Sequence, residues 1–252
     1  ANNGFHKVVS ATTTAMVLPD YLVNETSVSL TIVALPVITN GNTFQSFSIE
    51  RTYTDLSNIA EAFSGCAIAG FSFDATGTGV AKFSSDWLGV DTASVTAQTV
   101  DNPFATGAEM TNTNGIQWVR EGKTSAMADL SVLGMGFTVA NDLRKQYELS
   151  RFGAKGLKFG DFKVNGTLRA YFANSVLVDK FMAQTETALA TAISDESTAR
   201  GGAYLFDFPA VRFTDAQRVA GGRNDDVIVD MPWQAIYDGA SHTMKVCKIA
   251  SV

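Results

Sequence analysis

The residues that most often carry out chemistry in proteins are scarce and widely separated in this chain. Its two histidines, His6 and His242, lie near opposite ends, and neither has a cysteine or an acidic motif around it. The cysteines, Cys66 and Cys247, are also far apart and do not have the short spacing of a metal site. Two cysteines in a chain of this length do not make a disulfide framework. We interpret the cysteines as small buried hydrophobic residues and the histidines as structural or surface residues.

Two other motifs could bind a phosphate or a cation. Gly77-Thr78-Gly79 is the densest glycine cluster, but it lies in a predicted hairpin turn and lacks the strand–loop–helix context of a phosphate-binding loop. Asp225-Asp226 beside Arg223 is an acidic pair whose oxygen spacing is poor for calcium and favours a solvated turn. We therefore predict no enzyme activity, no metal and no cofactor. A hydrolase built around one of the histidines is a third reading, which replacement of both histidines would test.

Composition favours one large all-β domain or two small ones. The 252 residues are 46% hydrophobic and 17% charged, with plentiful Thr, Ser, Ala, Gly and Phe and little Pro, a mixture typical of strands and turns. The net charge of −6 argues against a protein that grips phosphates, but it allows a surface past which DNA slides. The amino terminus shows no export signal, and the apolar run 28–38 is too short to span a bilayer. We expect a soluble protein made in the cytoplasm.

Alternation and turn residues predict the elements that position these side chains. Strands are expected over 21–37, 44–53, 128–139, 187–193, 203–211, 227–237 and 242–249, with a hairpin over 67–83 that turns at 76–79. Short helices are expected after Thr54-Asp55, ending at Gly65, and over 175–184. Pro232 lacks a backbone donor, so its strand should lie at a sheet edge or bend there.

The central element of this prediction is a second long hairpin over 156–172. Asn165-Gly166 is a typical turn dipeptide, and the apolar phase slips across Gly160-Asp161, as at a β-bulge.

Two registers are open for this hairpin. A two-residue turn places Val164 opposite Thr167 and leaves both faces mixed. A three-residue loop places Val164 opposite Leu168, and Phe162 opposite Ala170. We favour the three-residue loop because one face can then be buried.

The chain divides into an arm (1–20), a first β unit (21–88), a loop or linker (89–125) and a second β unit (126–252). The loop is rich in Thr, Ala, Asn and Asp, and a loop of that length is usually functional. Gly70-Phe71-Ser72-Phe73 resembles Gly156-Leu157-Lys158-Phe159, and each precedes a turn that contains glycine. This match predicts that the β unit is internally duplicated.

An ordered set of short matches resembles the tail tube (major tail) proteins of bacteriophages with long non-contractile, siphovirus-like tails. The matching stretches are FSIERTYTD (47–55), NGTLRAYF (165–172), LVDKF (177–181), FDFP (206–209), VRF (211–213) and MPWQAIYD (231–238). The region of resemblance as a whole extends over residues 44–249. Residues 1–40 and 89–125 contain no recognisable motif of the family.

The resemblance implies a β-sandwich-like unit whose long strands join neighbouring subunits into a ring barrel, with rings stacked into a tube for DNA ejection. It implies a virion location after synthesis in the host bacterial cytoplasm, with the tape measure, tail terminator and tail-tip proteins as partners and no membrane. A duplicated unit would give three chains per ring with pseudo-sixfold symmetry, and an unduplicated one six. The alternative is a carbohydrate- or receptor-binding β-sandwich of the tail tip or baseplate.

Three groups of residues are candidates for these roles. Acidic residues expected to face the lumen are Glu50, Asp74 and Asp161. Residues of the predicted hairpin expected to contact a neighbouring subunit are Phe162, Val164, Leu168 and Phe172. Residues 91–115 and the arm 1–20 are expected to contact the next ring.

Overall fold

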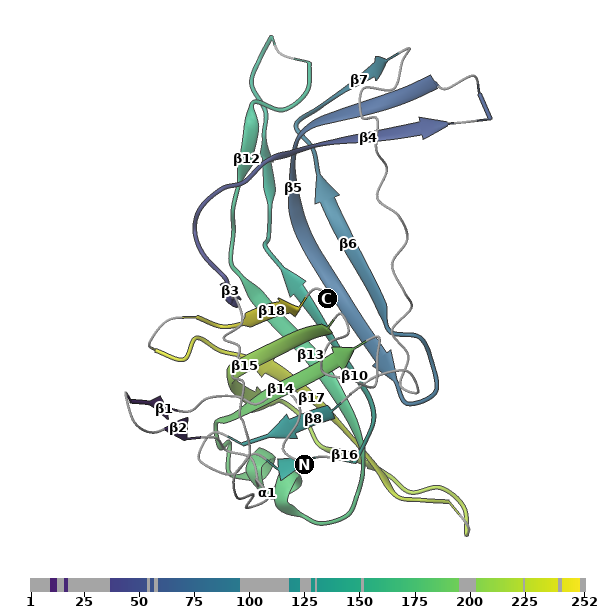
Figure 1. Cartoon of the computed structure of the whole chain (residues 1–252), viewed down its shortest axis with the longest axis vertical. Coiled ribbons are helices and arrows are strands. Elements are labelled where there is room, and N and C mark those ends of the chain that lie inside the picture. The colour runs from purple at the N-terminus through teal and green to yellow at the C-terminus, as the bar shows by residue number, and fades with distance from the viewer. Residues whose placement is uncertain are drawn as a thin grey trace, which may run out of the picture.

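A computed structural model shows a molecule built almost wholly of antiparallel strands (Figure 1). The structure describes residues 10–12, 16–17, 37–53, 55–56, 59–95, 118–122, 128–129, 131–150, 152–194, 203–223, 225–239 and 242–249. Within these ranges there is a single α-helix, and the predicted all-β class is confirmed.

The strands follow one another in short steps along the chain. The first are β1 (Ser10–Ala11), β2 (Met16–Val17), β3 (Val37–Thr39), β4 (Phe47–Tyr53), β5 (Ile59–Thr76), β6 (Lys82–Leu88), β7 (Asp91–Val95), β8 (Trp118–Glu121) and β9 (Ala128–Asp129). They are followed by β10 (Val132–Ala140), β11 (Arg144–Gln146), β12 (Gly156–Lys158), β13 (Lys163–Tyr171), β14 (Thr187–Ser194), β15 (Ala203–Phe213), β16 (Gln217–Val219), β17 (Ile228–Ala235) and β18 (Lys245–Ile249). The helix α1 spans Val176–Met182 and confirms the second predicted helix.

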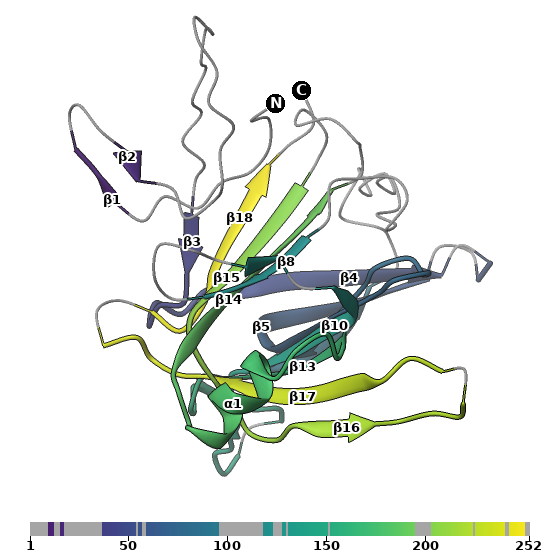
Figure 2. The same ribbon diagram turned by 90° about the horizontal axis from the view of Figure 1, so that it is seen from below.

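Fourteen strands form one continuous sheet in the order β4-β5-β10-β13-β17-β15-β14-β8-β9, with β3, β6, β7, β16 and β18 attached beside this path. The sheet folds over on itself. β14 and β15 cross over β10 and β13 in Figure 1, and the view from below in Figure 2 shows α1 beside the same strands. The resulting two layers enclose the core.

Aromatic rings fill the space between the layers. Phe137 on β10 lies at the centre, with its ring centroid 5.0 Å from that of Phe206 and 5.1 Å from that of Phe208 on β15. Phe73 on β5 lies 5.3 Å from Phe137, and Trp233 on β17 lies 4.8 Å from Phe208. These distances are in the range of favourable aromatic pairs, so the cluster ties four strands together.

The predicted turn at Asn165-Gly166 is wrong, because both residues lie in the middle of β13. β13 pairs along its length with β10 and with β17, and Gly166 stands between Phe137 and Trp233. A Cβ atom on Gly166 would lie 2.3 Å from the Cζ2 atom of Trp233. Glycine is therefore needed here to make room for the indole ring and not to turn the chain.

Both registers proposed for the 156–172 hairpin are also wrong. Val164 lies opposite Val139, and Leu168 lies opposite Met135, both on β10. β12 pairs with β11 instead of β13, so the apolar slip at Gly160-Asp161 marks the break between two strands. The similarity to the first hairpin therefore loses its structural basis.

The helix predicted after Thr54-Asp55 is wrong, because β5 begins at Ile59. Pairing with β4 places Ile59 opposite Tyr53 and Phe63 opposite Ile49, and this pairing overrides the helical spacing. Three positions of β5 span two of β4 at this point, where Gly65 has a φ of +61°. The predicted helix stop at Gly65 is thus a β-bulge that bends β5.

Pro232 lies inside the sheet, where its missing donor does no harm. β17 is flanked by β13 on one side and by β15 and then β16 on the other. Pro232 falls between the stretch paired with β15 and the stretch paired with β16, and its carbonyl accepts the N–H of Thr214 at 2.8 Å. Its nitrogen faces the gap between two partner strands, so no ladder hydrogen bond is lost.

A partly buried ion pair fixes α1 to the sheet. Lys180 on α1 places its Nζ atom 2.6 and 2.7 Å from the two carboxylate oxygens of Glu121, which is 3% exposed on β8. The Thr187 hydroxyl on β14 donates to the same carboxylate. The buried charge is thus paired and hydrogen-bonded, as burial requires.

The two predicted β units share one sheet, since β5 of the first pairs with β10 of the second. The 67–83 hairpin and its turn at 76–79 are confirmed by β5 and β6. β7 and β8 lie inside the range predicted as a loop, which is wrong for those two stretches. The strand expected over 21–37 and most of the arm 1–20 and of residues 96–125 lie outside the described residues.

Candidate channel face and subunit edges

Four central strands, β5, β10, β13 and β17, form a sheet with two unlike faces. Side chains alternate along each strand, so paired residues stand in rows across the sheet. The inner face carries the aromatic core. The outer face carries four rows: Gly70, Ala140 and Lys163; Ser72, Thr138, Asn165 and Gln234; Asp74, Gly136, Thr167 and Pro232; and Thr76, Gly134, Arg169 and Asp230.

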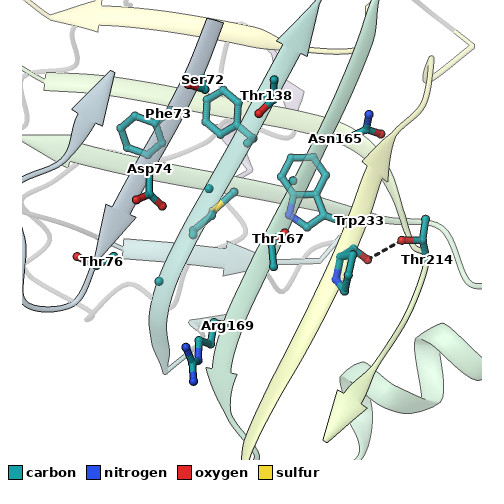
Figure 3. Close-up of a pocket in the computed structure, with 16 residues that line it drawn as sticks. Ser72, Phe73, Asp74, Thr76, Thr138, Asn165, Thr167, Arg169, Thr214 and Trp233 are labelled. Carbon is teal, nitrogen blue, oxygen red and sulfur yellow. Dashed lines mark hydrogen bonds between the residues drawn. The ribbon is translucent and has the colours of Figure 1, made fainter. Parts of the chain in front are cut away.

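A shallow open hollow of about 680 Å³ lies on this outer face (Figure 3). It exists because Gly134 and Gly136 carry no side chains at the middle of β10. A Cβ atom on Gly136 would lie 3.2 Å from a carboxylate oxygen of Asp74, which marks one side of the hollow. Figure 3 shows Thr138 and Thr167 along the adjacent strands and Arg169 at the far end.

The outer face is hydroxyl-rich, and its charges are of both signs: Lys82 on β6 lies opposite Asp74, and Lys163 lies on β13. The Arg169 guanidinium is 3.4 Å from the Asp230 carboxylate on the neighbouring strand, so its charge is partly balanced. Asp74 is the other charged residue of the lining. The lining holds no histidine or cysteine beside its hydroxyl groups, so it offers no nucleophile with an adjacent base. Such a face suits weak contact with a charged polymer better than tight phosphate binding.

Two strand edges at opposite sides of this sheet are open in the part of the chain that the structure describes. β6 pairs only with β5, and β16 pairs only with β17. Phe83 on β6 is 60% exposed although its ring centroid lies 5.3 Å from that of the half-buried Phe71. The apolar layer thus continues to the sheet edge without a cover, and open strand edges are pairing sites for other chains.

The family model of phage tail tube proteins matches residues 5–235 of this chain. The chain belongs to the phage tail tube protein family. The match covers most of both predicted β units. A comparison with individual curated proteins gives no match.

Membership in the tail tube family makes the chain a structural component of the virion tail. The described residues include no helix long and apolar enough to cross a membrane. They also include no cluster of three or more histidine, cysteine or acidic side chains able to hold a metal ion.

Of the three acidic residues expected to line a lumen, only Asp74 lies on the polar face of the central sheet. Glu50 lies on β4, where its carboxylate accepts the Thr52 hydroxyl at 3.4 Å. Asp161 is exposed in the segment before β13, 3.6 Å from the ammonium group of Lys163. The alternation around Phe71 and Phe73 is the signal that places Asp74 on the polar face.

The four hairpin candidates lie in or against the core of this same chain. Val164 and Leu168 are fully buried, so their side chains have no surface to offer a neighbour, and that expectation is corrected. Phe162 and Phe172 are partly buried against the core. The strict alternation of 163–171 could have identified one continuous strand, because Val164, Leu168 and Ala170 all point inward.

The remaining sequence candidates have structural surroundings. His242 is buried before β18, and its backbone N–H donates to the Asp238 carboxylate at 3.3 Å. Asp225 closes a turn by accepting the Gly222 N–H at 2.7 Å. Burial raises the pKa of the thiols of Cys66 and Cys247, and both cysteines are free. His6 lies outside the described residues.

Proposed function

We propose that this tail tube protein closes into rings through its β6 and β16 edges, and that stacked rings form the conduit for DNA ejection. The observation that carries the proposal is a central sheet with one dry aromatic face, one hydroxyl-rich face and an open edge at each side. Pairing β6 of one copy with β16 of the next removes both edges and closes a barrel. The hydroxyl-rich face then lines the channel.

The lining chemistry supports passage without capture. DNA is held by lysine and arginine side chains that displace its counterions. Arg169 is the one basic residue of the hollow, and Asp230 lies beside it. The two lysines of the same face also have acidic neighbours, because Lys82 on β6 lies opposite Asp74 and the Lys163 ammonium lies 3.1 Å from the Asp142 carboxylate. Glu50 and Asp161 stay candidates for the channel only where ring closure brings β4 and the segment before β13 to the channel wall.

Strand arithmetic favours six chains per ring. Each chain contributes six strands, β6, β5, β10, β13, β17 and the edge strand β16, to the proposed wall. With strands about 4.8 Å apart and tilted about 40°, three chains give a backbone diameter of about 36 Å and six give about 72 Å. Side chains from both walls would narrow the three-chain channel to about the width of duplex DNA, whereas the six-chain channel leaves the duplex ample room. The three-chain expectation rested on a hairpin match that the structure does not support.

In the tail this tube would meet the tape measure protein inside it, the tail terminator at one end and the tail-tip proteins at the other. We propose the siphovirus-like, non-contractile type and synthesis in the host bacterial cytoplasm, on the strength of the sequence resemblance. Residues 91–115 and the arm 1–20 stay candidates for contacts between rings.

Electron microscopy of the purified protein tests this proposal. We expect stacked rings with an open channel and sixfold class averages. Phe83→Lys, which puts a charge on the open β6 edge, should abolish rings, whereas Val80→Lys, between the 76–79 turn and β6, should not. Small monodisperse particles of the unaltered chain at every concentration would refute the tube and favour the tail-tip binding module.

A further inference from the structure

The tip of the β11–β12 hairpin carries three large apolar side chains that the fold of the single chain does not use. Tyr147 is 74% exposed, Leu149 is 94% exposed and Phe152 is 92% exposed. Such a group at the end of a projecting hairpin is a sign of a contact with another molecule, because it contributes nothing to the core.

The hairpin has a defined shape. The Lys155 N–H donates to the Gln146 carbonyl at 2.7 Å, and the Ala154 N–H donates to the Val90 carbonyl at 3.1 Å. Ser150 has a φ of 67°, a conformation that non-glycine residues rarely adopt. The tip therefore turns through a backbone conformation that costs free energy in a residue other than glycine.

A second exposed apolar surface lies at the opposite end of the molecule. On α1, Met182 is 75% exposed and Val176 is 51% exposed, and Val227 before β17 is also exposed. In Figure 1, with the longest axis vertical, the β12 hairpin is at the top and α1 and β16 are at the bottom. The two surfaces therefore face away from each other along the long axis.

The two ends also differ in charge. The hairpin carries Arg144, Lys145, Lys155 and Lys158 against Glu148 and Asp142, a local excess of positive charge in a chain whose net charge is −6. The end that contains α1 and the β16–β17 hairpin carries Asp179, Asp215, Asp225 and Asp226 against Arg218 and Arg223, and its further cation, Lys180, is paired with the buried Glu121. Complementary charge of this kind sets register and suppresses wrong contacts.

We infer that the β11–β12 hairpin tip is the axial stacking contact, and that it docks on the α1 end of a second copy in the next ring. The inference rests on the proposed tube. Because the two surfaces differ and lie at opposite ends, the contact is head-to-tail, and repeated head-to-tail contacts build an open tube. The occupant of the tip is thus another copy of this chain.

The first test separates ring formation from stacking. Leu149→Asp with Phe152→Asp should give rings of normal symmetry that do not stack, and Met182→Asp should do the same from the other side. Tyr237→Asp is the matched control. Tyr237 is 60% exposed but belongs to neither of the two surfaces, so this variant should form tubes. Circular dichroism should show unchanged folding for all variants.

The outcomes are distinguishable. Tubes of normal length from the double variant overturn the stacking contact and leave the proposed function standing. An unaltered chain that forms neither rings nor tubes overturns the proposed function and this inference with it.

The second test fixes which surfaces meet. In a Cys247→Ser background, Leu149→Cys and Met182→Cys chains of different tagged mass are mixed and oxidised. The contact predicts dimers of mixed mass at least tenfold more abundant than dimers of either chain with itself. Abundant Leu149→Cys self-dimers would show a tip-to-tip contact and overturn the head-to-tail arrangement.

Discussion

The Phe137 cluster and the tip of the β11–β12 hairpin contain the same kinds of side chain in opposite surroundings. Phe137 is 2% exposed and lies among rings from β5 and β15, whereas Phe152 is 92% exposed at the end of a hairpin. The first set holds one chain together. The second is free to hold two chains together. The contrast teaches that the high apolar content of this chain serves two separate purposes, and substitutions can separate them.

The largest expected effect comes from emptying the core. Phe137→Ala should lower the free energy of unfolding by about 3–5 kcal/mol, because four neighbouring rings lose their common partner. Phe152→Ala, the matched change at the tip, should stay within about 0.5 kcal/mol. Denaturant titration followed by tryptophan fluorescence measures both. Equal decreases in the free energy of unfolding for the two variants would contradict the proposed difference between the core and the hairpin tip.

Ion pairs sharpen the same comparison. Lys180→Met should cost about 2–4 kcal/mol, because it leaves the buried Glu121 carboxylate without its cation. Lys155→Met breaks the exposed pair with Glu148 at the hairpin and should cost less than about 1 kcal/mol. Adding Glu121→Met to Lys180→Met should recover most of the loss. Thermal unfolding provides the measurement, and an unrecovered double variant would contradict the buried-charge explanation.

Two glycines give a third pair. Gly166→Ala should cost about 1–3 kcal/mol, because the new methyl group would overlap the Trp233 indole. Gly156→Ala on β12 meets no atom within 4 Å and should be neutral. Chemical denaturation of Gly166→Ala and of Gly166→Ala with Trp233→Phe measures the free energy of unfolding. If the smaller Phe ring does not restore part of the stability lost in Gly166→Ala, steric overlap with the indole is not the cause.

The smallest effect is expected at the surface. A hydrogen bond from the Lys163 ammonium to the Asp142 carboxylate raises the pKa of Lys163 above its ordinary value of 10.5, and Asp161 adds to this. A raised folded-state pKa gives stability that is present below 10.5 and lost as the pH rises through the folded-state pKa. The small difference in Tm between the unaltered chain and Lys163→Gln should therefore vanish in strongly alkaline buffer. A difference that persists there would assign the effect to packing.

Alternation predicted the strands whose two faces meet different surroundings. In β13, Val164 and Leu168 face the core while Lys163 and Arg169 do not, and β10 and β15 show similar patterns. The all-β class, α1 and the polar placement of Asp74 follow from such local patterns. They needed no knowledge of distant partners.

Local patterns failed where two physical demands select the same residue. A turn and a clearance for an indole ring both call for glycine, so Gly166 was read as a turn while its true reason, Trp233, lies far away in sequence. The spacing of Ile59 and Phe63 fits a helix as well as a strand paired with β4. The exposure of Leu149 and Phe152 had no sequence signal, because burial is decided by what packs against a segment.

β5 has a mechanical consequence. Its 18 residues extend over roughly 60 Å without a break in the backbone. One end pairs with β4 and β7 and the other with β6 and β10. A force applied to the first end would be transmitted through the backbone of β5 to the second end. There it would act parallel to the strands, on all the hydrogen bonds to β6 and β10 at once. The bend at Gly65 would be the most easily deformed point of β5, so the wall could flex there while the strand pairing is kept.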